Sequence, residues 1–301
     1  MDKVTAVITT YKRPVNMLER ALKSVINQTY KNMDIIVVND YPEDENLVRE
    51  IGEMIQSHIQ ERKIQYIVVE KNGGACKARN TALSVADCDY IAFLDDDDEW
   101  LPEKIEEQIS EARRHPEAAI IYCNAYIQED GNNKRSLRFD NEQPSGDIFS
   151  QMIAKNVVGS CTFPLIKAET MRNVNGFRED MPALQDWELY LKILKQHSAG
   201  YIHKPLAVYY FYDGERISTN PQRRIDAYEK IHAEFYDDIE KDKKAASYFY
   251  LMGTYFYSFK DRKTAFAYYV KGVKNDPTKI GRNVRDLLCM VGRRLIKSKR
   301  I

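Results

Sequence analysis

The chain has 301 residues, 44% of them apolar, and its 45 basic and 45 acidic side chains give a formal net charge of zero. This composition excludes an intrinsically disordered chain, and the balanced charge gives no overall attraction to nucleic acid, so no nucleic-acid partner is expected. The length is sufficient for one large hydrophobic core and a smaller second one.

The five cysteines are odd in number, scattered, and never spaced as Cys-x-x-Cys, and the five histidines show no metal-ligand spacing. These patterns predict reduced core thiols instead of a disulfide framework or a zinc site. The apolar run at residues 4–10 is too short for a signal peptide, and no run of about 18 apolar residues occurs anywhere. The sequence therefore predicts a cytoplasmic protein that is neither secreted nor membrane-spanning.

Between residues 4 and 124, short apolar runs alternate with segments of helical periodicity. The runs are VTAVI, DIIVVN, IQYIVV, YIAFL and AIIYC. Such an order predicts a parallel sheet with helices on both faces. The first helix is expected to begin near Pro14 and to turn one apolar face toward the sheet. That face carries Leu18, Leu22, Val25 and Ile26.

The second half of the chain gives weaker signals. Residues 128–146 are polar and show no periodicity, which predicts a surface loop that binds an acceptor or moves. A helix is expected over residues 184–196, and the aromatic run at 206–212 predicts a strand. Beyond Pro221 the pattern indicates helix only.

Residues 247–277 carry one copy of a tetratricopeptide-like pattern of small and aromatic positions. The positions are Leu251, Gly253, Tyr257, Ala265, Tyr269 and Pro277. Because such repeats need neighbours to bury their faces, a helical hairpin packed on the main domain is one interpretation. A module for a protein partner or for self-association is the other.

A final helix is expected over residues 280–296, with an apolar stripe and basic side chains largely off it. Two interpretations stay open for this segment. It packs against the protein with a solvated basic face, or residues 280–300 make peripheral contact with the anionic inner face of the membrane.

Four consecutive aspartates, residues 95–98, follow the apolar strand that ends at Leu94. Adjacent carboxylates repel one another and destabilise a fold unless a cation compensates them, and hard oxygen ligands favour magnesium, manganese or calcium. The carboxyl ends of strands are also where open α/β sheets bind ligands. The alternative is a solvated acidic loop or the start of a helix, where aspartate is favourable.

Five motifs over residues 1–215 resemble family 2 glycosyltransferases in order and spacing. They are VITTYKRP with a helix and then QTY, IIVVNDYPED, NGGACKARNTAL, YIAFLDDDDEW, and GFRED followed by QDWELYLKI. The resemblance implies a GT-A fold, an α/β architecture with a Rossmann-like mixed sheet flanked by helices. We expect a nucleotide-sugar-binding half at 1–98, an acceptor-binding half at 99–220, and a C-terminal helical extension at 221–301.

Carried over by position, the resemblance places Thr9, Thr10 and Tyr11 in the pocket for the base and ribose of the donor. It assigns Asp40 to a ring N–H of the base, as a carboxylate can accept from uracil. A turn residue before Pro42 is the alternative role of this aspartate.

The same resemblance assigns the donor diphosphate and its cation. Gly74 permits close backbone approach, and the guanidinium of Arg79 is expected to contact base or diphosphate. Asp97 is the expected ligand of Mn²⁺ or Mg²⁺, and Asp95 a second ligand or a contact to the ribose or a metal-bound water. Asp96 stands between them where relatives often have a small residue, so an additional ligand or a more negative site is implied.

By resemblance, Asp186 is the general base, with a simple helix cap as its alternative role. Two departures from the family pattern accompany it. The usual Glu-Asp pair is Gln185-Asp186 here, and the usual Tyr-Arg-x-His is replaced by the aromatic residues 209–212. Asp213 or Arg216 is a candidate to replace the missing histidine.

The implied activity is transfer of a sugar from a nucleotide-diphosphate donor, with UDP expected, to an acceptor hydroxyl with inversion. The acceptor class is a saccharide, a lipid-linked saccharide or another hydroxyl compound, and the setting by analogy is bacterial surface polysaccharide or glycoconjugate assembly. One alternative is a catalytically silent GT-A scaffold that works through its helical tail. A nucleotidyltransferase is the other, although VITTYKRP lacks the glycine-rich loop that it would need.

Overall fold

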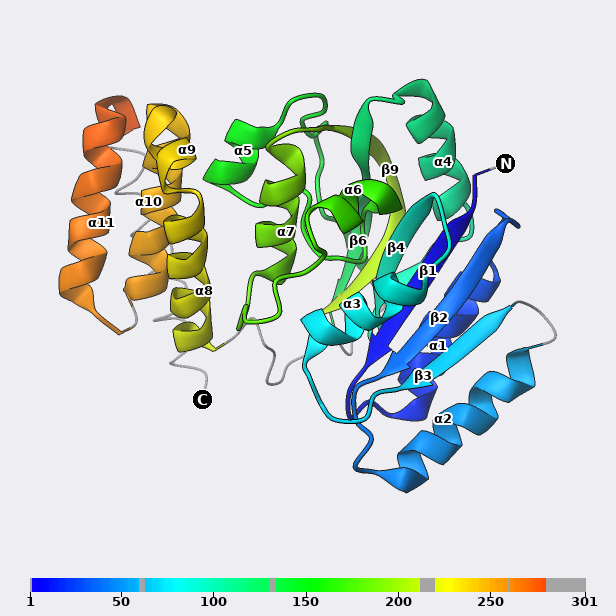
Figure 1. Ribbon diagram of the computed structural model, residues 1–301. Helices are drawn as coiled ribbons and strands as arrows, with labels where there is room; N and C mark the ends of the chain where they lie inside the picture. Colours follow the sequence, from blue (N-terminus) through cyan, green and yellow to red (C-terminus); the bar gives the residue numbers. More distant parts are fainter. Residues whose placement is uncertain (1, 60–62, 130–133, 212–219, 259, 280–301) are drawn as a thin grey trace. The chain divides into compact units, whose positions relative to one another are not determined.

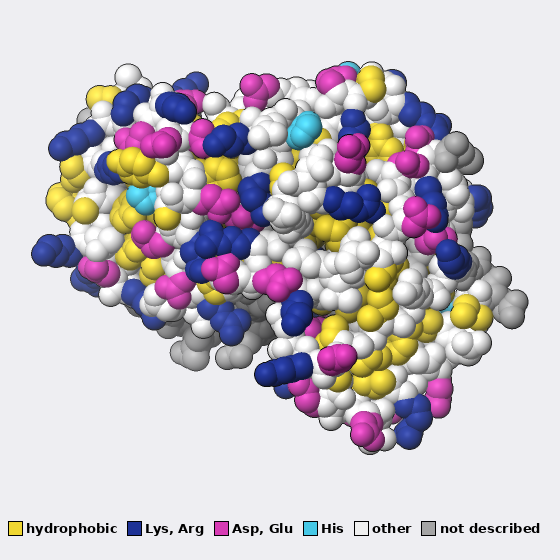
Figure 2. Space-filling model, viewed as in Figure 1, with side chains coloured by type: hydrophobic (Ala, Val, Ile, Leu, Met, Phe, Trp, Pro, Cys, Tyr) yellow, Lys and Arg dark blue, Asp and Glu magenta, His cyan; other side chains and the backbone are white. Residues whose placement is uncertain are grey.

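The computed structural model describes residues 2–59, 63–129, 134–211, 220–258 and 260–279 (Figure 1). Their contacts divide the chain into two compact units. The first comprises Met1–Ile148, Val157–Asp180 and Gln185–Gly214, and the second Phe149–Asn156, Met181–Leu184 and Glu215–Ile301. Acidic and basic side chains are interspersed on the surface that Figure 2 shows, as the balanced composition implies.

The first unit is built on one mixed sheet whose described strands run in the order β3-β2-β1-β4-β8-β6-β9-β5, with β7 paired to β6. The strands are β1 (Val4–Thr10), β2 (Met33–Asn39), β3 (Ile64–Val68), β4 (Tyr90–Asp95), β5 (Glu99–Trp100), β6 (Ala118–Glu129), β7 (Arg135–Leu137), β8 (Leu165–Lys167) and β9 (Ser198–Phe211). Its helices are α1 (Val15–Ile26), α2 (Glu45–His58), α3 (Ala75–Val85), α4 (Lys104–Arg114), α6 (Ala168–Asn173) and α7 (Gln185–Leu194).

The predicted parallel sheet is confirmed for its first part only. Strands β3, β2, β1 and β4 pair in parallel, and both faces of β1 are buried, with α1 and α3 packed against it. The run AIIYC, which lies in β6, does not pair with β4, because antiparallel β8 lies between the two strands. Three-residue β8 carries too short a pattern to be recognised from sequence.

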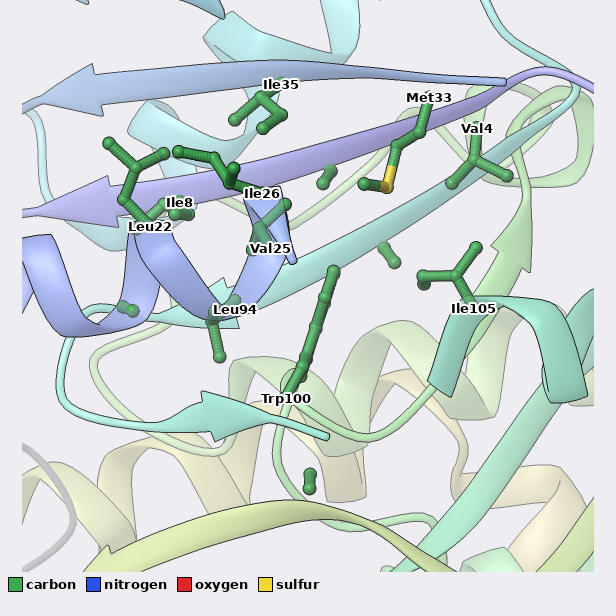
Figure 3. Close-up of a cluster of buried hydrophobic side chains, with 14 of the residues drawn as sticks. Val4, Ile8, Leu22, Val25, Ile26, Met33, Ile35, Leu94, Trp100 and Ile105 are labelled. Atoms are coloured by element: carbon green, nitrogen blue, oxygen red, sulfur yellow. The ribbon is translucent and has the colours of Figure 1, made fainter. Parts of the chain in front are cut away.

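The core under one face of this sheet forms around α1, which starts one residue after Pro14 as predicted. Its expected apolar face is buried, and it meets side chains from β1, β2, β4 and α4 (Figure 3). Trp100 lies among them and donates from its indole N–H to the carbonyl of Thr162 at 2.9 Å. Burial of each aliphatic side chain here stabilises the folded state by about 1.5–3 kcal/mol. The packed core therefore holds the ends of these strands in position.

The prediction of a surface loop over residues 128–146 is partly wrong. Strand β6 continues to Glu129, and β7 pairs with it in the register Tyr126↔Leu137. The residues of β7 are all exposed. Backbone hydrogen bonds hold this strand to β6, so its side chains show no periodicity from which the strand could be predicted. The strand expected at 206–212 starts earlier, at Ser198, and a register shift beside Pro205 explains why the first part lacks a regular pattern.

The second unit consists of helices α5 (Phe149–Ala154), α8 (Pro221–Glu234), α9 (Tyr236–Lys241), α10 (Lys243–Tyr257) and α11 (Arg262–Asn275), followed by the short 3₁₀ helix η2 (Pro277–Lys279). The expected hairpin is present as α10 and α11. Gly253 of α10 lets α8 and α11 approach this helix, because a Cβ there would lie 2.7 Å from the hydroxyl of Tyr228 in α8 and 2.9 Å from the ring of Tyr268 in α11. The expected helix at 280–296 and the candidates Asp213 and Arg216 lie outside the described residues.

The N-termini of these helices follow from the sequence. The side chains of Asn220, Asp242 and Asp261 accept hydrogen bonds from the first backbone N–H groups of α8, α10 and α11. Among the described helices, none is both long enough and apolar enough to cross a membrane.

Candidate functional site

Parallel pairing brings three strand ends to one edge of the sheet. Thr9 of β1 is in register with Asp95 of β4, and Thr10 with Asn39 of β2. The backbone N–H of Asp40 donates to the carbonyl of Thr10 at 2.9 Å. The predicted donor-binding residues of β1, β2 and β4 therefore meet at the edge where open α/β sheets bind ligands.

The carboxylate of Asp40 organises the loop that leads into α3. It is 3% exposed and accepts hydrogen bonds from the backbone N–H groups of Gly73 at 2.9 Å and Gly74 at 2.7 Å, and from the amide of Asn72 at 2.8 Å. Gly74 has φ +83°, a conformation that favours glycine. The turn after β2 is made by Asn39, whose side chain accepts from the N–H of Tyr41. Contact of Asp40 with a base stays a prediction, and carboxylate oxygens have acceptor capacity left for it.

An aromatic corner lies beyond the ends of β1 and β2. Tyr11 is 46% exposed and meets Tyr41 edge to face, with ring centroids 5.3 Å apart. The ammonium of Lys12 lies 5.1 Å from the Tyr11 centroid and 4.6 Å from that of Tyr41. Such a corner can stack a planar base on its exposed ring.

Asp95 ends β4 and is held on both of its oxygens. Arg79 of α3 donates to Oδ1 at 2.8 Å, and the hydroxyl of Ser160 donates to Oδ2 at 3.0 Å. Arg79 is 8% exposed, and its guanidinium lies 5.3 Å from the ring of Phe177. Arg79 thus lies beside the aspartate run with Asp95 as its described hydrogen-bond partner, and its contact with a base or diphosphate stays a prediction.

The next two aspartates share one arginine. Arg13 donates from Nε to Asp96 at 2.9 Å and from Nη2 to Asp97 at 2.8 Å. Arg20 of α1 donates to the backbone carbonyl of Asp97 at 2.6 Å. Burial raises the pKa of Asp96 to about 6, although the charge of Arg13 lowers it.

Asp98 is fully buried and has a structural role in the turn. Its carboxylate accepts from the hydroxyl of Thr162 at 2.6 Å and from the backbone N–H of Tyr210 in β9 at 3.1 Å. Burial, together with the charges of Asp95 and Asp97, raises its pKa well above the usual range. Asp98 ties the aspartate run to β9 and to the loop that carries Thr162.

Asp186 is the second residue of α7, and its Oδ1 accepts the N–H of Trp187 at 2.8 Å. Burial raises the pKa of this carboxyl to about 6, while the charge of Arg79 lowers it and that of Asp95 raises it. The carboxylate therefore lies close enough to the aspartate run to be affected by its charges. A carboxyl group with a pKa near 6 is suited to exchange protons near neutral pH.

The donor set of the aspartate run fits a magnesium or manganese ion. Within the described residues, no three acidic, histidine or cysteine side chains form a group that could hold a metal by themselves. Mg²⁺, however, usually binds through one or two carboxylates and completes its shell with waters and substrate phosphates. Asp95 and Asp97 lie in one turn, and their binding of the ion as such a pair stays a prediction.

Sequence reasoning did not assign the partners of the aspartates. Arg13 and Arg20 precede Asp97 by 84 and 77 residues, and Ser160 follows Asp95 by 65. Arg13 lies in the motif VITTYKRP, so its position was marked although its role was not. Ser160 lies in a segment without any recognisable pattern.

Residues 5–169 match the sequence model described as "Glycosyl transferase family 2", and the chain belongs to this family. It is 25% identical over 239 residues to the Escherichia coli glycosyl transferase WcaA, which is named for colanic acid biosynthesis, covering 77% of this chain and 81% of that protein. It is 29% identical over 196 residues to an uncharacterized glycosyltransferase of Rickettsia conorii, covering 64% of this chain. The match spans only 31% of that Rickettsia protein.

Solved structures show the same fold. Staphylococcus aureus TarS in complex with UDP-GlcNAc superposes with a TM-score of 0.67 at 18% identity, covering 90% of this chain and 79% of that one. The Pyrobaculum calidifontis mannosyltransferase PcManGT, in complex with GDP-Man and Mn²⁺, gives 0.64 at 16% identity, covering 89% and 74%. The predicted α/β GT-A fold with helices at the C-terminal end is confirmed.

Proposed function

We propose that this protein transfers a sugar from a nucleotide-diphosphate donor to an acceptor hydroxyl with inversion. The observation that supports this most is the meeting, at one sheet edge, of an exposed aromatic corner with the aspartate run, near a carboxyl group of raised pKa. Family membership supports the same activity. UDP is the proposed nucleotide, since TarS was solved with UDP-GlcNAc, and GDP is the alternative, since PcManGT was solved with GDP-Man.

Each predicted residue of the donor-binding half has its own proposed role. The exposed ring of Tyr11 stacks on the base, and Thr9 and Thr10 line the pocket for base and ribose. Asp40 accepts from a ring N–H of the base while it holds the backbone of Gly74 in place. Arg79 positions Asp95.

Asp97 and Asp95 hold the divalent cation, Mn²⁺ or Mg²⁺, and Asp96 makes that site more negative. When bound, the cation supplies positive charge that stabilises the diphosphate as it leaves. Because these carboxylates lie together at the end of β4, the leaving group is bound at a fixed position at the sheet edge.

Asp186 is the proposed general base. It takes the proton of the acceptor hydroxyl onto its carboxylate as the hydroxyl oxygen attacks the anomeric carbon from the side opposite the diphosphate. This geometry inverts the anomeric centre. With a pKa of about 6 the carboxylate is mostly ionised at pH 7, so transfer is expected to slow as the pH falls below about 6.

The acceptor proposed is a saccharide, a lipid-linked saccharide or another hydroxyl compound of bacterial surface polysaccharide assembly, the setting for which WcaA is named. We further propose a cytoplasmic protein that contacts the anionic inner face of the membrane through residues 280–300. Association with a partner or a second copy through residues 221–301 is proposed from the helical-repeat pattern.

The test is donor binding that depends on the cation. With Mn²⁺ present, one nucleotide sugar of a UDP- and GDP-sugar panel should stabilise the fold by about 2.7 kcal/mol at ~100 times its Kd, measured by thermal unfolding. Asp97→Asn should abolish this shift. Asp87→Asn, which changes a carboxylate whose side chain is 99% exposed, should leave it intact. If no sugar nucleotide stabilises the protein with Mn²⁺, or if Asp97→Asn behaves as the wild type, the proposal fails.

A further inference from the structure

Arg13 bridges two neighbouring carboxylates of the aspartate run. Its Nε donates to Asp96 at 2.9 Å and its Nη2 to Asp97 at 2.8 Å. The side chain of Arg13 is 39% exposed, whereas those of Asp96 and Asp97 are 8% and 21% exposed. Arg13 is therefore the most exposed of these three side chains.

The backbone on either side of Arg13 is held in position. Lys12 has φ +53°, a left-handed conformation that is unfavourable for a residue with a side chain. Pro14, with φ −57°, forms the N-cap of α1. Strained backbone conformations gather at ligand sites. Here the strained residue is Lys12 itself, whose ammonium lies at the aromatic corner, while the side chain of the next residue, Arg13, lies at the aspartates.

Two other arginines at the run are held more firmly. Arg79 is 8% exposed, and its guanidinium lies over the ring of Phe177. Arg20 donates to a backbone carbonyl and lies 4.0 Å from the ring centroid of Tyr210. Arg13 has only carboxylates as described hydrogen-bond partners. Of these three arginines, Arg13 can change partners with the least rearrangement.

We propose that Arg13 is a displaceable counter-cation of the donor site. Without a donor it neutralises Asp96 and Asp97. When a divalent cation reaches Asp97, the two positive charges repel each other, and the guanidinium transfers to the phosphate oxygens that arrive with the cation. The carboxylate of Asp97 thus stays paired throughout, because it exchanges one cation for another. This inference rests on the proposed function, because it requires a cation-bound diphosphate at the aspartate run.

The test uses Arg13→Met and two binding measurements that should move in opposite directions. Binding of Mn²⁺ alone, measured by electron paramagnetic resonance of free Mn²⁺, should become tighter by roughly three- to tenfold, because the competing cation is gone. Binding of UDP at saturating Mn²⁺, measured by titration calorimetry, should weaken roughly tenfold, since a charge-assisted contact to phosphate is lost. GDP replaces UDP as the probe if the wild type binds only GDP.

The other outcomes contradict the proposal. If Arg13 only supports the shape of the run, Arg13→Met weakens both Mn²⁺ and UDP binding. If Arg13 is a fixed surface ion pair, neither affinity changes. Arg13→Lys should show smaller changes of the same opposite signs, because one ammonium cannot bridge two carboxylates as a guanidinium does. This variant decides the question if Arg13→Met does not fold.

Two controls separate this inference from the proposed function. Arg178→Met makes the same substitution in an arginine that pairs with Asp180 at 2.6 Å, and both affinities should stay at wild-type values. Asp97→Asn should abolish Mn²⁺ binding. If the wild type binds Mn²⁺ and Asp97→Asn does not, the function stands, and Arg13→Met alone decides the inference. If the wild type binds no Mn²⁺ even with nucleotide present, both the proposed function and the inference about Arg13 are wrong.

Discussion

The aspartate run of the first unit and an aromatic cluster of the second unit satisfy their polar groups in different ways. The aromatic cluster comprises Tyr228, Phe249, Tyr250, Tyr257 and Tyr268. In the run, four carboxylates are adjacent in sequence, and arginines compensate three of them, Asp95, Asp96 and Asp97. In the cluster, Glu229 accepts from the hydroxyls of Tyr257 at 2.6 Å and Tyr268 at 2.7 Å. Glu240 accepts from Tyr250 and pairs with Lys271 at 3.0 Å.

This difference separates a functional arrangement from a stabilising one. Single carboxylates with neutral hydroxyl donors satisfy buried groups without repulsion between like charges. Adjacent carboxylates repel and raise one another's pKa, so a fold gains nothing from gathering them unless they bind a ligand. Substitutions in the first unit's site should therefore change activity more than stability, and substitutions in the cluster should do the reverse.

The largest expected effect is on catalysis. Asp186→Asn removes the proposed general base and should lower the rate of sugar transfer about 10²- to 10⁴-fold. Donor binding with Mn²⁺ should stay near the wild-type value, because this carboxylate acts on the acceptor. Single-turnover assays and donor titrations separate the two. Asp87→Asn is the matched control, and an unchanged transfer rate in Asp186→Asn would remove this residue from the mechanism.

The same substitution should stabilise the protein at neutral pH. The pKa of Asp186 rises from 3.8 to about 6 on folding, so between these pH values the folded state keeps a proton that the unfolded state has lost. Stability contributed by this group falls as the pH rises through that window, by about 3 kcal/mol in total. Asp186→Asn should therefore be more stable than wild type at pH 7, measured by urea unfolding, and the difference should vanish near pH 4. Equal stability at pH 7 would contradict the raised pKa.

The opposite outcome is expected in the cluster. Phe249 is fully buried and stacks on Tyr228 with centroids 4.5 Å apart. Phe249→Ala should lower the free energy of unfolding by about 3–5 kcal/mol through lost burial and a cavity. The control is Phe266→Ala in α11, where the ring is 67% exposed and the cost should stay within about 0.5 kcal/mol. Similar losses in both variants would mean that the cluster is not a packed core.

The fold could be predicted where periodicity is regular. The runs of β1, β2, β3 and β4, and the face of α1, follow from apolar patterns in sequence. Strands β5, β7 and β8 have two or three residues and carry no such pattern. Helix α5 belongs to the second unit although more than 60 residues separate it from α8, and local patterns do not reveal contacts over such separations.

For the candidate site, the sequence marks acidic residues whose roles stay predictions, but it does not reveal the partners of those acids. Conspicuous motifs marked Asp40, Asp97 and Asp186 by sequence alone. What holds a carboxylate in place depends on the tertiary fold. Asp40 accepts from a loop 33 and 34 residues later, and the hydroxyl of Ser160 reaches Asp95 across 65 residues. Serine and glycine are too common in sequences for such a role to be predicted from their presence.

The smallest expected effect tests whether the cluster stabilises through its hydroxyl groups as well as its rings. Tyr268→Phe removes one of the two hydroxyls that donate to Glu229, and Tyr257 still satisfies that carboxylate. The loss should therefore be about 0.5–1.5 kcal/mol, the net value of one hydrogen bond, in urea unfolding at pH 7. Tyr269→Phe is the matched control. The ring of Tyr269 stacks on Phe266, and this contact survives loss of the hydroxyl, so the cost should be smaller. If Tyr268→Phe costs no more than this control, packing alone stabilises the cluster. The aspartate run and the cluster would then differ only in that one gathers charged groups and the other buries apolar rings.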